Sequence, residues 1–430
     1  MIQEYLRYTK TATCPFGVVK EAEEYLKKAG FYSIKPEDEW NIERGKGYFM
    51  NLYGSSFIAF YVGQEFSSDG RLTIAAAHSD QPCFVIKPNA VMESGKYRKL
   101  NVEAYGGAIL NTWLDRPLGI AGIVAEKGSD AFHPHVRVVD FKRAMLVIPN
   151  MAIHFNRDVN KGVELNKQKD MLPLLGMMEA YVSDKMEEKD YLLRLLSEET
   201  GIKAEDILDY QLYLYNFEDG MTVGVNHDML LAPRIDNLAS VFACVKAVTS
   251  GKNESGLNVI AIFDNEEVGS RTKQGAGANL FAGILERIYA ALSVERETFL
   301  RSVNGGFFLS VDGAHAVHPN QSEKYDPTNP VYLNDGIVLK RAANQAYATD
   351  AVAAGIIKEI CGKNNIAYQE FVNKSDSAGG STLGAIASTL LPMRMADVGV
   401  PMLAMHSSME TMGTKDLEAL VRLVTSLFEA

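Results

Sequence analysis

The sequence has few cysteines and no long hydrophobic run, and these absences exclude whole classes of protein. The cysteines lack the paired spacing of a disulfide framework or a zinc knuckle, so small buried thiols in a reducing compartment are expected. No apolar stretch approaches the roughly 20 residues that cross a bilayer, and the N-terminus does not resemble a signal peptide. We therefore expect a cytoplasmic protein. The four cysteines are Cys14, Cys83, Cys244 and Cys361.

The chain also lacks an excess of positive charge. It has 43 Lys and Arg against 54 Asp and Glu, a net charge of −11. Nucleic acid and anionic membrane are therefore not expected as partners, because no basic stripe outweighs the general repulsion. Two familiar motifs are missing as well. No G-x-S-x-G nucleophile elbow occurs, and the segment "GGSTLG" at 379–384 lacks the Gly-Lys-Ser/Thr ending of a phosphate-binding loop.

The pattern of apolar residues divides the chain into two parts. With 430 residues the chain exceeds the usual range of one hydrophobic core, so two domains are expected. After about residue 229, strands alternate with helices, which predicts an α/β domain with a mostly parallel sheet. Residues 90–228 instead resemble antiparallel strands with glycine turns. We therefore expect one α/β domain, residues 1–89 and 229–430, interrupted by a β-rich insertion, residues 90–228.

Particular elements follow from the same patterns. The expected strands are at 71–80, 258–263, 305–312 and 401–406, and the expected helices are at 15–30, 183–210, 237–250 and 344–363.

The stretch "NVIAIFDNEEVGS" poses the question of function, because a buried strand ends abruptly in adjacent acids, Glu266 and Glu267. Other expected strands also end in polar residues. Because the carboxyl ends of strands in an open α/β sheet converge on one crevice, these residues are expected to meet there. The further residues are His78, Asp80, Asp312 and His406 at strand ends, and Asp236 just before a helix.

The residue types indicate a metal-dependent hydrolase. Two imidazoles with several carboxylates and no thiolate suit zinc, manganese or cobalt. The donors are numerous enough for two ions sharing a bridging carboxylate, with one carboxylate left as a base. Taken singly, each residue has an ordinary explanation. His78 is then a core histidine, Asp236 a helix N-cap, and Asp312 a turn residue. It is their coincidence at one sheet edge that favours the metal site.

The other histidines have weaker support from spacing. His154 lies in the insertion, outside the constellation of strand ends. His315 and His318 follow Asp312 and are placed to line the cleft, whereas the remaining three are interpreted as surface or turn residues. These three are His133, His135 and His227.

Eight motifs, in this order, closely resemble the M18 family of metallo-aminopeptidases, the aspartyl aminopeptidase family. They span nearly the whole chain, and several are long and uncommon. The motifs are "AAHSDQPC", "YGGAILNTWLDRPLGIAG", "IPNMAIHFNR", "RIDNLAS", "DNEEVGS", "SVDGAHAVHPN", "LKRAANQAYATD" and "AMHSSME".

The resemblance implies a role for each matching residue. Two divalent metal ions per subunit are expected, with zinc first and cobalt or manganese as alternatives. By motif position, His78 and Asp312 bind one ion and Asp236 bridges both. Glu266 is the general base and Asp80 orients His78. The expected ligands of the second ion are Glu267 and His406.

The resemblance also implies an architecture and an assembly. The expected fold is a three-layer α/β/α catalytic domain with a mixed, mostly parallel sheet, interrupted by a β-rich dimerisation domain. A tetrahedral homo-dodecamer built from dimers is expected, in which His154 reaches a neighbouring subunit's active site. Glu266 and Glu267 are expected to divide their roles because neighbours on an extended chain point to opposite sides. The positive charge of the metals offsets their repulsion.

The substrates implied by the resemblance are small peptides, from which acidic N-terminal residues, or a mixture including them, are removed. An acidic side chain needs a local cation in this acidic protein, and Lys374, Lys340 and Arg341 are candidates, with His315 beside them. Lys374 stands where eukaryotic members of the family carry an arginine. Two alternatives stay open: a related di-metal amide hydrolase or deacylase, and a non-catalytic assembly protein.

Overall fold

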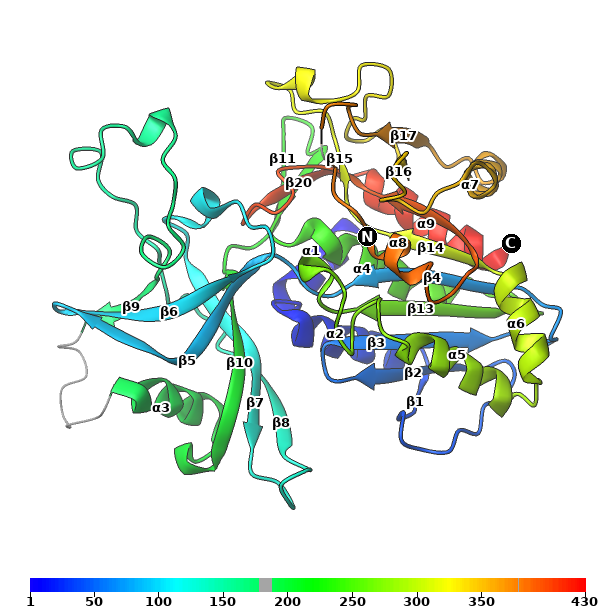
Figure 1. Cartoon of the computed structure of the whole chain (residues 1–430), viewed down its shortest axis with the longest axis horizontal. Helices are drawn as coiled ribbons and strands as arrows, with labels where there is room; N and C mark the ends of the chain where they lie inside the picture. Colours follow the sequence, from blue (N-terminus) through cyan, green and yellow to red (C-terminus); the bar gives the residue numbers. More distant parts are fainter. Residues whose placement is uncertain (178–187, 378) are drawn as a thin grey trace. The chain divides into compact units, whose positions relative to one another are not determined.

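The computed structural model describes residues 1–177, 188–377 and 379–430, and it separates the chain into two compact units (Figure 1). The first unit consists of Met1–Asp80, Gly220–Met405 and Glu410–Ala430. The second consists of Gln81–Asp219 together with the short segment His406–Met409. The chain thus leaves the first unit after Asp80 and returns to it at Gly220.

The first unit is built on a β-sheet that has nine strands in the described part of the chain. Its order is β1-β2-β3-β13-β4-β14-β18-β16-β17. The central strands β13, β4, β14 and β18 are mutually parallel, whereas β3 and β16 are antiparallel to their neighbours β13 and β18. The predicted mixed, mostly parallel sheet is confirmed. The strands are β1 (Tyr32–Ser33), β2 (Gly47–Leu52), β3 (Ser56–Val62), β4 (Leu72–His78), β13 (Leu257–Phe263), β14 (Phe307–Val311), β16 (Ile337–Arg341), β17 (Tyr368–Val372) and β18 (Arg394–Gly399).

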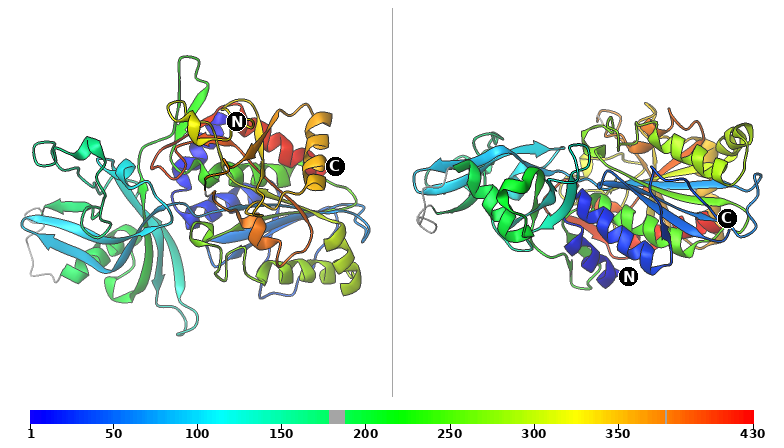
Figure 2. Two further views of the ribbon diagram at one scale, coloured as in Figure 1. Left: turned by 45° about the horizontal axis from the view of Figure 1, so that its top comes forward. Right: turned by 90° about the horizontal axis from the view of Figure 1, so that it is seen from below.

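Helices cover both faces of this sheet, as Figure 2 shows, so the predicted three-layer α/β/α arrangement is confirmed as well. One face carries α1 (Ile2–Thr11), α2 (Pro15–Lys28), α4 (Ile235–Ser250), α7 (Ala351–Lys363) and α9 (Asp416–Glu429). The other face carries α5 (Leu280–Ala291), α6 (Arg296–Gly305) and α8 (Leu383–Ala387).

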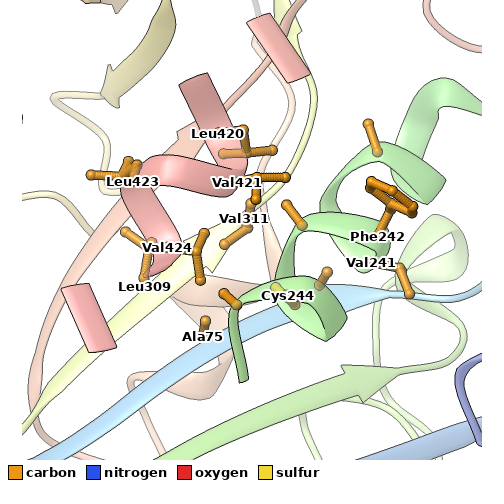
Figure 3. Close-up of a cluster of buried hydrophobic side chains, with 14 of the residues drawn as sticks. Ala75, Val241, Phe242, Cys244, Leu309, Val311, Leu420, Val421, Leu423 and Val424 are labelled. Atoms are coloured by element: carbon orange, nitrogen blue, oxygen red, sulfur yellow. The ribbon is translucent and has the colours of Figure 1, made fainter. Parts of the chain in front are cut away.

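The continuous hydrophobicity of the central strands follows from this covering. In β4, Ala75 packs on the side of α4 and α9, and Ile74 packs on the side of α5 and α6. Successive side chains of a strand point to opposite faces, so a strand covered on both faces must be apolar throughout. Figure 3 shows the first of these layers, where Cys244 of α4 and Val424 of α9 lie over β4 and β14. Each large aliphatic side chain buried there contributes about 1.5–3 kcal/mol.

A smaller sheet of the first unit carries residues that matter for the site. Its order is β11-β12-β20-β19-β15. Asp236 follows shortly after β12, and Glu410 is the first residue of β20. The strands are β11 (Met221–Val223), β12 (Met229–Ala232), β15 (Ala314–His315), β19 (Pro401–Leu403) and β20 (Glu410–Gly413).

The second unit is built on an antiparallel sheet with the order β8-β7-β10-β5-β6-β9. The helix α3 (Glu188–Thr200) precedes β10 in the chain. The antiparallel strands that were predicted for this region from its glycine turns are therefore present. The strands are β5 (Cys83–Ser94), β6 (Tyr97–Tyr105), β7 (Leu118–Glu126), β8 (His135–Asp140), β9 (Leu174–Met177) and β10 (Ile207–Asn216).

Three predicted elements are wrong in their bounds. The helix expected at 344–363 begins only at Ala351, because the side chain of Asp350 caps it by accepting a hydrogen bond from the Ala353 amide at 2.7 Å. The helix expected at 183–210 ends at Thr200, and its first residues, 183–187, lie outside the described residues. The strand expected at 401–406 ends at Leu403, because Ala404 and His406 have left-handed φ values of 56° and 68°. Among the described residues, no helix is long and apolar enough to cross a membrane.

Candidate metal centre and active site

The candidate residues of the first unit gather where three parallel strands end. The strands β13, β4 and β14 are neighbours in the sheet, and Phe263 pairs in register with His78. Their carboxyl ends therefore share one edge. His78 ends β4, Glu266 and Glu267 follow β13, and Asp312 follows β14 directly.

His78 is buried and has a polar partner on each ring nitrogen. Its Nδ1 lies 3.0 Å from the backbone carbonyl oxygen of Asp80, which can only accept a hydrogen bond. Nδ1 therefore donates to that carbonyl, and Nε2, which faces the other side, is the nitrogen that a metal ion would bind in exchange for a proton. On that side, Nε2 lies 3.4 Å from Oδ1 of Asp236 and 3.5 Å from Oδ1 of Asp312. This is the orientation that a metal-binding histidine needs.

The spacing and chemistry of these donors fit a divalent metal ion. Atoms that bind one zinc ion at about 2.0–2.2 Å lie roughly 3.3–3.5 Å apart in tetrahedral geometry, which is the spacing around His78 Nε2. Ligand atoms of His78, Asp236 and Glu267 also lie within 4.8 Å of one another. The arrangement thus presents a nitrogen and several carboxylate oxygens to a common space.

Glu266 and Glu267 occupy a tight turn held by Asp80. They begin a short 3₁₀ helix, Glu266–Val268, between Asn265 and Gly269, which both have positive φ, 64° and 97°. The two carboxylate oxygens of Asp80 accept hydrogen bonds from the Glu266 and Glu267 amides, each at 3.1 Å. The expected extended backbone at this pair is therefore wrong. The side chains still diverge, because successive residues of a 3₁₀ helix are about 120° apart.

Crowding of buried acids raises the pKa values of the titratable groups at this site. Burial, with the nearby Asp312, raises the pKa of Glu266 to about 8 despite the opposing effect of His78. Burial, followed by Asp236, raises the pKa of Glu267 well above its usual range. Burial alone lowers the pKa of His78, but hydrogen bonds to Asp236, Asp312 and Asp80 outweigh it and raise that pKa. Such a site is stabilised by any cation that replaces the protons.

His406, the remaining predicted ligand, belongs to the second unit. It lies in the segment His406–Met409, and its Nδ1 is 3.3 Å from the carbonyl oxygen of Gly107. Its own carbonyl oxygen accepts a hydrogen bond from the Ile109 amide at 3.0 Å. The structure therefore brings together four of the predicted ligands in the first unit, and the role of His406 stays a prediction. The four are His78, Asp236, Glu267 and Asp312.

The predicted substrate-binding residues have distinct surroundings. Lys340 is buried, and its Nζ donates a hydrogen bond to the Gly313 carbonyl at 3.0 Å and lies 3.9 Å from Oδ2 of Asp312. Lys374 is partly exposed and lies 3.2 Å from Oδ2 of Asp376. The ring of His315 packs against Phe371, at 6.0 Å between centroids.

Arg341 forms an ion pair with Glu370 at 3.1 Å. His154, from the second unit, is exposed in a loop beside Phe155, whose exposed fraction is 83%. Lys340 contacts the Asp312–Gly313 turn, which carries a predicted ligand.

Two residues of the site were missed at the level of sequence. Glu410 is buried and accepts a hydrogen bond from the Asp236 amide at 2.9 Å. Asn237 donates from Nδ2 to the carbonyl of Val311, the residue before Asp312, at 3.0 Å. A signal was present for each, because Glu410 ends the motif "AMHSSME" and Asn237 belongs to "RIDNLAS".

Comparisons of the sequence and of the structure with known proteins agree on one protein family. The family model described as "Aminopeptidase I zinc metalloprotease (M18)" matches residues 8–428. "Probable M18 family aminopeptidase 2" of Clostridium novyi is 44% identical over 415 residues, which covers 96% of this chain and 95% of that protein. "Aspartyl aminopeptidase 4" of Saccharomyces cerevisiae is 34% identical over 461 residues, 99% of this chain and 94% of that protein. Among solved structures, "Cryo-EM structure of the Ape4 and Nbr1 complex" contains a chain with a TM-score of 0.96 at 33% identity, covering 99% of this chain and 85% of its own length.

Proposed function

This chain belongs to the M18 family of zinc metallo-aminopeptidases, and from that membership we propose how its residues perform the reaction. It is a metallo-aminopeptidase, a peptide hydrolase that uses a divalent metal. We propose that two ions bind per subunit and that zinc is the metal, with cobalt or manganese as alternatives. The observation that carries this proposal is the convergence of carboxylate oxygens on Nε2 of His78, at 3.4 and 3.5 Å.

The proposed ligands divide between the two ions. His78 and Asp312 would hold one ion, Glu267 and His406 would hold the other, and Asp236 would be shared by both. Once bound, the metal pair polarises the scissile carbonyl and lowers the pKa of water at the site. Asp80 keeps His78 in its Nδ1–H tautomer and holds the turn that presents Glu267.

Glu266 is the proposed general base. It stands next to a ligand in sequence, and its turn is fixed by the same Asp80 carboxylate. Its side chain takes a proton from the attacking water and then delivers that proton to the leaving amino group. Burial raises its pKa to about 8 without metal, and positive charge arriving beside it lowers that value toward the range where it accepts a proton.

The proposed substrates are small peptides with a free N-terminal amine and an acidic or mixed preference for the first residue. The buried ammonium group of Lys340, close to Asp312, supports this because it supplies positive charge at an otherwise acidic site. The test measures hydrolysis of Asp-, Glu- and Leu-p-nitroanilide together with their N-acetylated forms, with and without chelator. Acidic substrates are expected to be cleaved well and the acetylated ones not at all. A clear optimum for Leu rejects the acidic preference.

We further propose that the chain assembles as a tetrahedral homo-dodecamer built from dimers, that the dimers form through the second unit, and that His154 enters a neighbouring subunit's active site. The loop around His154 exposes Met151, Ile153 and Phe155 at 61%, 43% and 83%, apolar surface that a partner subunit would cover. The test is native mass spectrometry with a complementation assay. Co-expressed His154→Ala and Glu266→Gln subunits are expected to recover activity in mixed oligomers that neither variant has alone. Absence of recovery contradicts action between subunits.

A further inference from the structure

The backbone that carries Asp236 is held from outside the metal cluster. Glu410, the first residue of β20, is 2% exposed, and its Oε2 accepts a hydrogen bond from the Asp236 amide at 2.9 Å. Glu410 reaches this position because it pairs in register with Ala232 at the end of β12, four residues before Asp236. A hydrogen bond between an amide and a buried carboxylate is short and strong, so it restrains the turn closely.

Two more contacts restrain the residues on either side of Asp236. Nδ2 of Asn237 donates to the Val311 carbonyl at 3.0 Å, which ties this turn to the end of β14. Nη2 of Arg234 donates to the Thr9 carbonyl at 2.7 Å, which ties the turn to the last turn of α1. Three consecutive parts of the turn are therefore anchored to three different elements, β20, β14 and α1.

We propose that Glu410 is a positioning residue for metal binding, which acts by fixing the Asp236 backbone so that its carboxylate faces His78. Asn237 acts on the same turn, because its hydrogen bond to the Val311 carbonyl holds that turn close to β14, the strand that precedes Asp312. This inference rests on the ligand role proposed for Asp236. The hydrogen bond of Glu410 is to the main-chain amide of Asp236, so the proposed effect passes through the backbone.

The physical basis is preorganisation. A carboxylate on a loose turn must lose conformational freedom when it binds a metal, and that loss weakens binding. Groups that hold a ligand in place typically contribute 10–100-fold in metal affinity. Glu410 also adds a further carboxylate close to an acidic cluster, which is electrostatically unfavourable. A neutral acceptor would make the same hydrogen bond without that cost if the bond served only the fold.

Asp416 provides a matched control in the same unit. It is also fully buried and accepts backbone hydrogen bonds, from the Asn334 amide at 2.7 Å and the Gly336 amide at 3.1 Å. These amides belong to a turn that carries none of the proposed ligands. Its removal tests what losing a buried carboxylate acceptor does to the fold alone.

The experiment compares Glu410→Ala, Glu410→Gln and Asp416→Ala with the wild type. Zinc affinity is measured by competition with a chromophoric chelator on folded protein, and the stability of each metal-free variant by urea unfolding. Glu410→Ala is expected to bind zinc about 10–100-fold more weakly. Glu410→Gln is expected to stay within a few-fold of the wild type, because its amide oxygen still accepts the Asp236 hydrogen bond. Asp416→Ala is expected to lose stability and keep its zinc affinity.

A second measurement covers the case in which Glu410→Ala does not fold. Hydrogen exchange of the Asp236 amide in metal-free Glu410→Gln and wild type reports the contact directly, and slow exchange is expected in both. Wild-type zinc affinity in Glu410→Ala, or fast exchange of that amide in the wild type, overturns the inference. Asp236→Ala separates the two proposals: unchanged zinc binding there refutes the ligand assignment itself, whatever Glu410 does.

Discussion

The carboxylate of Asp80 accepts a hydrogen bond from the backbone amide of Glu266 at 3.1 Å, across 186 residues of sequence. The same carboxylate accepts the next amide, that of Glu267, and the Asp80 carbonyl accepts from the ring of His78. One residue after β4 therefore orients a proposed ligand on its own strand and shapes the turn after β13. Its role is wider than the orientation of a histidine expected from sequence.

Replacing Asp80 by Asn is expected to lower kcat by about 10–100-fold, the range for groups that support a metal ligand. An amide side chain has one oxygen, so its NH₂ group must face one of the two backbone N–H donors. KM is expected to change little, because Asp80 does not face the substrate. The measurement is steady-state hydrolysis of the preferred aminoacyl nitroanilide, with zinc content determined in parallel.

Asp326→Asn is the matched control for Asp80. Asp326 also accepts two backbone amides, those of Thr328 and Asn329, both at 3.0 Å, within its own loop. Normal kinetics are expected for this variant. Equal losses in the two variants would show that Asp80 acts only on general stability.

Replacing Glu266 by Gln is expected to lower kcat by at least about 100-fold, because the side chain keeps its size and loses its basic oxygen. Zinc content is expected to stay normal. Glu267→Gln, one residue away, is expected to lose zinc, since it removes a proposed ligand. Metal analysis and turnover of the two variants thus separate the base from the ligand. A Glu266→Gln enzyme with full activity would reject the mechanism.

Metal binding is expected to release protons and to tighten as the pH rises. Without metal, burial and nearby acids raise the pKa of Glu266 to about 8 and that of Glu267 well above its usual range. Glu266 is thus mostly protonated at neutral pH, and the raised pKa of Glu267 acts in the same direction, so protons compete with the cation. The apparent affinity is expected to rise about tenfold per pH unit for each proton displaced. Calorimetric titration of metal-free protein with zinc, in buffers of different ionisation enthalpy, counts those protons. Binding independent of pH and buffer contradicts the crowded-acid description.

Much of the first unit follows from local sequence. The strand that ends at His78 and the strands that precede Glu266 and Asp312 are short apolar runs, and apolar runs alternating with helical patterns predict parallel neighbours with a common edge. Four proposed ligands therefore meet where strand ends were expected to meet. The family resemblance supplied what spacing cannot, the division of roles among the carboxylates.

The parts that sequence did not predict depend on long-range contacts. The Asp80 carboxylate reaches the Glu266 amide because β4 and β13 are adjacent and in register. The sequence around either residue gives no signal of that hydrogen bond. Lys340 offers a positive charge in the sequence, but its contact with the Gly313 carbonyl follows from the antiparallel pairing of β16 with β18. The turn at Glu266 was expected to be extended, because the left-handed conformation of Asn265 has no strong local signal.

The backbone of Gly399 packs closely against the backbone of Asp312. A Cβ atom at Gly399, the final residue of β18, would lie 1.5 Å from the Asp312 carbonyl oxygen, and backbone cannot move aside as a flexible side chain can. Gly399→Ala is therefore expected to destabilise the metal-free protein by about 3 kcal/mol or more and to weaken zinc binding through the displaced Asp312.

Gly355 in α7 has no atom within 4 Å of the same position and serves as the control. Gly355→Ala is expected to be neutral or to stabilise by about 0.5–1 kcal/mol, because alanine favours the helix. Urea unfolding and zinc competition on both variants give the comparison. If Gly399→Ala matches the control in stability and affinity, β14 and β18 are not packed as closely beneath the proposed ligand as the backbone distances require.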